Sequence, residues 1–170
     1  MKELFINKEI FLLTTSASFQ RANVYKKIRD EKEVKYFKNM LQGYLQNLVE
    51  NDYQKQVSEN IHLENIKQLS VYSENFSKIL NNGKLNFGVS QKLLNLYLKY
   101  MWCLGKISTP PHFPVDRIIQ VKLNIPEIYA WTKMEDEQDY LEVINYAKDV
   151  LKELKYKNLS ELELNLFSRK

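Results

Sequence analysis

The sequence predicts an all-α protein that folds as one compact multi-helix domain over residues 1–170. Its four glycines and four prolines are too few for the frequent turns of a β-sandwich or a doubly wound α/β fold. Its apolar residues recur at helical spacing through most of the chain. A chain of 170 residues can bury roughly two thirds of its unfolded surface in one core, and no repeat, low-complexity tract or linker divides it.

Two amphipathic helical patterns follow a first segment, residues 1–15, that fits a helix and a strand equally well. Each pattern repeats apolar residues at the spacing of one buried helical stripe. The first stripe is formed by Phe37, Met40 or Leu41, Tyr44 and Leu48, and the second by Ile66, Leu69, Phe76 and Leu80. We expect Asn81-Asn82-Gly83 to end the second helix, because glycine readily adopts the left-handed conformation found at helix C-termini.

The next predicted helix, Val89 to Leu104, is apolar around most of its circumference. We therefore expect it to be the central buried helix, with Cys103 as a small residue of the core. Its polar residues Lys92, Asn95 and Lys99 lie at positions i, i+3 and i+7, which places them on one narrow strip of the helix.

Glycine and proline interrupt the chain after this helix. We expect Gly105 to end the helix, and the prolines of residues 110–114 to keep the following loop extended, because proline disfavours helix at itself and at the residue before it. A brief helix is expected from about Val115 to Leu123, before Pro126 breaks the chain again.

Capping boxes predict where the last two helices begin. Thr132 with Glu135 is expected to start a last long helix, and Ser160 with Glu163 to start a terminal helix that ends near Phe167. The long helix keeps an apolar seam against the core, formed by Tyr140, Ile144, Ala147, Leu151 and Leu154.

The composition excludes several kinds of site and location. Cys103 is the only cysteine, so no intramolecular disulfide, cysteine zinc cage or four-cysteine iron–sulfur cluster can form, and we expect neither a metal nor a cofactor. A lone thiol fits a reducing cytoplasm. Leu4 to Leu13 is interrupted by Lys8 and Glu9, which argues against a signal peptide, and no apolar run approaches the roughly 20 residues of a membrane span.

Basic residues gather in the middle of the chain. Residues 84–122 carry six lysines and arginines and only one acid, Asp116. Such a surface attracts phosphates, although a solvated lysine-rich face explains the same charges equally well. Of the two histidines, His62 is expected at the surface or the edge of the core, and His112 to pack within the proline-rich loop.

One stretch carries a motif. It reads FGVSQKLLNLYLKYMWCLG, residues 87–105, followed by HFPVDRII, residues 112–119. It resembles the helix-hairpin-helix DNA glycosylase family, in which a glycine-rich hairpin opens a helix, a lysine lies just inside that helix, and a Pro-Val-Asp motif follows. The matching residues are Gly88, Val89, Lys92 and Pro114-Val115-Asp116, with Ser90 in the place of the second hairpin glycine.

The resemblance implies a DNA-binding protein, possible action on a damaged base, and two catalytic residues. Lys92 would attack the sugar C1′ atom as a nucleophile, and Asp116 would orient it and stabilise positive charge on the sugar. Double-stranded DNA would be the partner. Exposed amides of the hairpin, Gly88, Val89 and Ser90, would bind a phosphate together with Lys99 and Arg117, and Phe113 or Trp131 would stack on a flipped base.

A helical protein–protein interaction module without enzymatic activity is the alternative function. In that case the seam on the Tyr140–Leu154 helix, or an aromatic surface, would bind another protein. A DNA-binding measurement over a series of salt concentrations separates the two functions, because phosphate contacts weaken steeply as salt rises.

Overall fold

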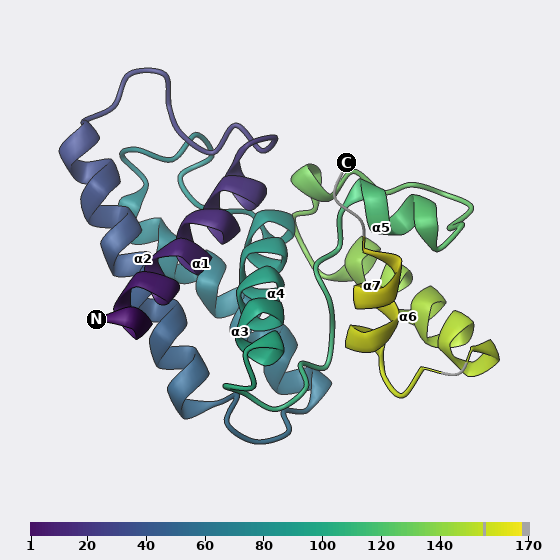
Figure 1. The fold of residues 1–170 in the computed structure, drawn as a ribbon. Helices are drawn as coiled ribbons and strands as arrows, with labels where there is room; N and C mark the ends of the chain where they lie inside the picture. Colours follow the sequence, from purple (N-terminus) through teal and green to yellow (C-terminus); the bar gives the residue numbers. More distant parts are fainter. Residues whose placement is uncertain (155, 168–170) are drawn as a thin grey trace.

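The computed structural model describes residues 1–154 and 156–167, which form seven α-helices and two short 3-10 helices joined by loops (Figure 1). An isolated antiparallel bridge between Tyr25 and Leu80 is the only β-type pairing in this described part of the chain. The predicted all-α class is therefore confirmed. The helices are α1 (Lys2–Phe19), α2 (Glu31–Asn51), α3 (Glu59–Ser73), η1 (Glu74–Phe76), α4 (Phe87–Cys103), α5 (Arg117–Lys122), η2 (Trp131–Lys133), α6 (Gln138–Glu153) and α7 (Leu159–Leu166).

Helix α4 is the central buried helix that its apolar circumference predicts. Figure 1 shows α1 and α2 on one side of it and α5, α6 and α7 on the other, and α3 also packs against it. It begins at an Asn86 cap, whose side chain accepts a hydrogen bond from the backbone amide of Val89. Gly105, with a φ of 69°, follows its end as expected, because glycine tolerates this left-handed conformation.

The ambiguous N-terminal segment is helical. One face of α1 is buried and includes Ile10, Phe11 and Phe19, and this helix packs against α4. The opposite face leaves the large side chains of Phe5 and Leu12 exposed. Apolar residues on both faces explain why neither a helical nor an alternating pattern stood out in the sequence.

The predicted extension of the second amphipathic helix to Leu80 is wrong. Helix α3 ends at Ser73, where the Ser73 hydroxyl accepts a hydrogen bond from the Leu85 amide and the Ser70 hydroxyl donates one to the Leu85 carbonyl. These side-chain contacts tie the helix end to the segment before α4. Gly83 does adopt a positive φ, 73°, but in a loop turn rather than at a helix end.

Both predicted capping boxes are misplaced. Thr132 belongs to η2, and α6 begins only at Gln138. Helix α7 is capped by Asn158, which accepts a hydrogen bond from the Glu161 amide, rather than by Ser160. A capping box pattern is short, and a nearby asparagine can cap equally well.

Two other expectations about burial are wrong, and one about a seam needs correction. Cys103 lies exposed at the C-terminal end of α4, whereas His62 is fully buried. Tyr140, Ile144 and Ala147 of the α6 seam are buried in the protein's own core. Leu151 is half-buried and Leu154 exposed, so only the C-terminal end of the seam is open to a partner protein.

None of the helices in the described part of the chain is both long enough and apolar enough to cross a membrane.

Candidate functional site

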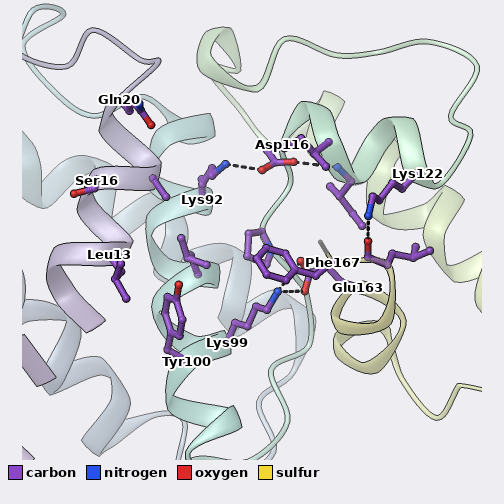
Figure 2. Close-up of a pocket in the computed structure, with 16 residues that line it drawn as sticks. Leu13, Ser16, Gln20, Lys92, Lys99, Tyr100, Asp116, Lys122, Glu163 and Phe167 are labelled. Atoms are coloured by element: carbon purple, nitrogen blue, oxygen red, sulfur yellow. Dashed lines mark hydrogen bonds and ion pairs between the residues drawn. The ribbon is translucent and has the colours of Figure 1, made fainter. Parts of the chain in front are cut away.

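A cleft with a volume of about 320 Å³ opens beside the polar strip of α4 (Figure 2). Helix α1 forms one wall, α4 the floor, and α5 together with α7 the other wall. The cavity is at the small end of the range of roughly 300–1,000 Å³ that ligand pockets usually occupy. Its charged lining residues are Lys92, Lys99, Asp116, Lys122 and Glu163.

Lys92 and Asp116 form an ion pair in this cleft. The Lys92 Nζ atom lies 2.7 Å from Asp116 Oδ2, although the residues are 24 positions apart in the sequence. The side chains are only 10% and 24% exposed, so water screens the pair weakly. Lys92 Nζ also lies 4.6 Å from the ring centroid of Trp131, within reach of a cation–π interaction.

The position of Asp116 is fixed from two sides. Its Oδ1 atom accepts a hydrogen bond of 3.0 Å from the Ile119 amide, which makes Asp116 the N-terminal cap of α5. The preceding residue, Val115, is held by the fully buried Gln91 of α4. The Gln91 side-chain amide donates to the Val115 carbonyl at 2.8 Å and its oxygen accepts from the Val115 amide at 3.1 Å. Gln91 has no pattern in the sequence that marks it as a site residue, because the motif includes only its neighbour Lys92.

A buried polar network continues from Gln91 to the loop that carries Asp116. Asn95 donates to the hydroxyl of Tyr140 at 3.0 Å, and that hydroxyl lies 2.9 Å from His112 Nδ1. Burial lowers the pKa of His112 to about 3, and burial together with His112 lowers the pKa of His62 to about 3. Both histidines are therefore neutral near pH 7. His112 packs within the loop, as the sequence suggested.

Lys99 and Glu163 form a second ion pair deeper in the cleft. Lys99 Nζ lies 2.7 Å from Glu163 Oε2, and the side chains are only 9% and 7% exposed. Burial raises the pKa of the Glu163 carboxyl, against the lowering effect of Lys99. Lys99 Nζ lies 3.8 Å from the ring centroid of Phe167. Glu163 and Phe167 thus contact a predicted site residue, a role that their pattern at the end of the chain did not reveal.

The three predicted hairpin residues lie inside the protein. Gly88, Val89 and Ser90 are buried in the first turn of α4. Their amides donate to the Met134 carbonyl, the Asn86 side chain and the Asn86 carbonyl, each at 3.0 Å. The expectation that these amides are exposed and ready to bind a phosphate is therefore not met.

The remaining predicted residues divide between the core and the cleft. Phe113 is buried in the core and does not line the cleft. Trp131, which is itself buried in the core, and the exposed Arg117 line a recess of about 200 Å³ that also contains Lys92 and Asp116. Lys92, Asp116, Lys99, Trp131 and Arg117 are thus brought together. Arg21, which the sequence did not bring to notice, lines the same recess from the end of α1.

No group of three or more histidine, cysteine, aspartate or glutamate side chains in the described residues is placed to hold a metal ion. Comparisons with protein-family models, with curated proteins and with solved structures found no match.

Proposed function

We propose that the protein binds DNA and acts on a damaged nucleotide as a base-excision glycosylase and abasic-site lyase, with Lys92 as the nucleophile and Asp116 as its partner. The observation that carries the proposal is the short Lys92–Asp116 contact, largely screened from water, in a cleft. The motif that resembles the helix-hairpin-helix glycosylases names the same two residues. A cytoplasmic location, suggested by the single cysteine, belongs to the same proposal.

The chemistry begins with proton transfer. In the ion pair the Lys92 ammonium is a poor nucleophile, and transfer of one proton across the 2.7 Å contact to Asp116 frees the lone pair of Nζ. A bond then forms between Nζ and the sugar C1′ atom. The bond from C1′ to the base breaks, and its electron pair leaves with the base.

Ring opening completes the imine. The bond between C1′ and the ring oxygen breaks as C1′ and Nζ form a protonated double bond. Of the three ammonium protons, one stays on the imine nitrogen, one goes to the departing base and one to the released sugar oxygen. Asp116, regenerated as a carboxylate, lies close enough to stabilise positive charge that develops on the sugar.

The cleft beside Lys92 is the proposed place for the extruded base. Its walls include the apolar side chains of Leu96 and Phe167, and the Lys99–Glu163 pair lies among its lining residues. Apolar walls suit the faces of a base, and a lysine beside a carboxylate offers both a donor and an acceptor to its edge. The indole of Trp131, in the adjoining recess, is the better of the two predicted aromatic residues for contact with the nucleotide.

Borohydride trapping tests this chemistry. Wild-type protein is incubated with duplex oligonucleotides that contain an abasic site or an oxidised, alkylated or deaminated base, and the imine is reduced to a stable amine. We expect a covalent protein–DNA adduct. Lys92→Gln should abolish it, whereas Lys133→Gln, which removes an exposed lysine from η2, should leave it unchanged.

The second catalytic residue has its own prediction. Asp116→Asn should slow base removal on the order of 10²-fold or more and change DNA affinity far less, because the carboxylate acts mainly in the transition state. Asparagine can still cap α5, and circular dichroism checks that the variant folds. A wild-type protein that gives no adduct and no strand cleavage on any of these substrates would refute the enzymatic proposal.

A further inference from the structure

Two exposed arginines lie in the recess beside the Lys92–Asp116 pair. Arg21 enters it from the residue just after α1 and its C-terminal cap, and Arg117 from the first turn of α5. Neither guanidinium makes a hydrogen bond or an ion pair with any described residue. By contrast, Arg29 donates to the Lys26 carbonyl and pairs with Glu31.

The recess provides no anion to neutralise these arginines. Asp116 is its only acidic lining residue, and both of its carboxylate oxygens are already used, one by Lys92 and the other by the Ile119 amide. Because Lys92 and Asp116 cancel each other's charge, the two guanidiniums leave the recess with a net charge of about +2. The surface is therefore complementary to anions.

The two arginines reach the recess from different elements, Arg21 from the end of α1 and Arg117 from α5. Gln20 and Ala17 of the α1 side line both the cleft and the recess, and Ile118 of α5 does the same. The recess is thus continuous with the cleft, and Lys92 and Asp116 lie where the two meet. A nucleotide whose base lay in the cleft would have its sugar at this junction and its flanking phosphates within the recess and its rim.

We propose that Arg21 and Arg117 form a phosphate clamp, in which they bind the two phosphodiester groups that flank the nucleotide held in the cleft. This inference rests on the proposed function and specifies its substrate as a polynucleotide rather than a free nucleoside or mononucleotide. Guanidinium suits the task, since its planar donors match two phosphate oxygens and its charge persists at any physiological pH.

Neutral phosphate analogues test the clamp directly. The probe is a duplex with one tetrahydrofuran residue, an abasic analogue without a reactive C1′ oxygen, and methylphosphonate linkages on both sides of it. Against the unmodified duplex, wild-type protein should lose roughly tenfold in affinity for each contact, the low end for a charge-assisted hydrogen bond. The Arg21→Gln/Arg117→Gln variant should bind the two duplexes with equal affinity.

Salt dependence gives a second readout and a matched control. For the unmodified duplex, the slope of log affinity against log salt should fall by about 0.9 for each arginine removed. Arg29→Gln, which removes an arginine already paired in the fold, should leave both the slope and the methylphosphonate effect as in the wild type. The free monophosphate of the same tetrahydrofuran sugar should bind far more weakly than the duplex.

The outcomes separate this inference from the proposed function. If wild-type protein gives the borohydride adduct but methylphosphonates cost equal affinity in wild type and in the double variant, the clamp is refuted and the enzymatic proposal stands. If wild-type protein does not bind the duplex at any salt concentration, both are refuted. If wild-type protein forms the adduct as well with free deoxyribose phosphate as with DNA, the clamp is also refuted.

Discussion

Close packing explains why residue 88 is glycine, and substitution with alanine tests that explanation. A Cβ atom at this position would lie 2.9 Å from the carbonyl carbon of Trp131 and 3.1 Å from Met134 Cβ, and it would overlap the Trp131 carbonyl oxygen. These neighbours include rigid backbone, so they cannot move aside as a flexible side chain does. The η2 segment, which carries the indole beside Lys92, has to shift.

The magnitude follows from three contributions. Overpacking costs about 1–3 kcal/mol. Displacement of η2 also breaks the hydrogen bond from the Gly88 amide to the Met134 carbonyl, and leaving these buried groups unpaired costs about 1–3 kcal/mol. Alanine returns about 1 kcal/mol through its higher helix propensity. The net loss in the free energy of unfolding is about 3 kcal/mol, which for a protein of this size lowers Tm by about 6–12 °C.

Urea denaturation and thermal melting measure this loss, and Gly43→Ala is the matched control. Gly43 lies inside α2, and a Cβ atom added there would have no neighbouring atom within 4 Å, so alanine should stabilise the protein by up to about 1 kcal/mol. If Gly88→Ala is as stable as the wild type and loses only DNA affinity, the packing explanation is wrong. Residue 88 would then be glycine because the backbone approaches a DNA phosphate closely.

Two further predictions concern the buried charges and the histidines. Lys99→Met should destabilise the protein by about 3–5 kcal/mol, because it leaves the buried Glu163 carboxylate without its partner cation. In a double-mutant cycle, Lys99→Met/Glu163→Leu should recover most of that loss. Because burial lowers the pKa of His62 and His112 to about 3, the unfolded chain binds more protons than the folded one below pH 6.5, so stability is full above that pH and declines as pH falls. Urea titrations should show that the free energy of unfolding falls by about 4 kcal/mol between pH 7 and pH 5, and His112→Gln should halve this loss. A variant that loses as much stability as the wild type would contradict the conclusion that the buried histidines are neutral.

The sequence was sufficient for the fold class and for the central helix, but not for several helix ends. The apolar circumference of α4 and the glycine after it are local signals, so they can be recognised without knowledge of the rest of the chain. The end of α3 is different, because it depends on Ser70 and Ser73 meeting Leu85, more than ten residues away. A periodic pattern that continues to Leu80 contains no record of that tertiary contact.

The site shows the same division between local and distant information. Lys92 and Asp116 could be paired from a motif, and the structure places them in contact. Gln91 contacts a segment 24 residues away. Glu163 pairs with Lys99 of α4, and Arg21 lines a recess together with residues of α5. None of these contacts can be read from a local pattern, because glutamine or glutamate within a helix and arginine after a helix are ordinary residues until folding brings them together.

The cost of burying charge supports a functional reason for the two lysines of α4. Lys92 and Lys99 both lie on the central helix with little exposure, and each needs a carboxylate from another element to offset its desolvation. Stability alone does not account for such pairs, since apolar residues of similar volume often stabilise a protein as well or better. A sequence selected only for a stable core would therefore place leucine or methionine at these positions. Two lysines on one strip of α4, both lining the same cleft, instead fit the proposed site for an anionic or electrophilic substrate.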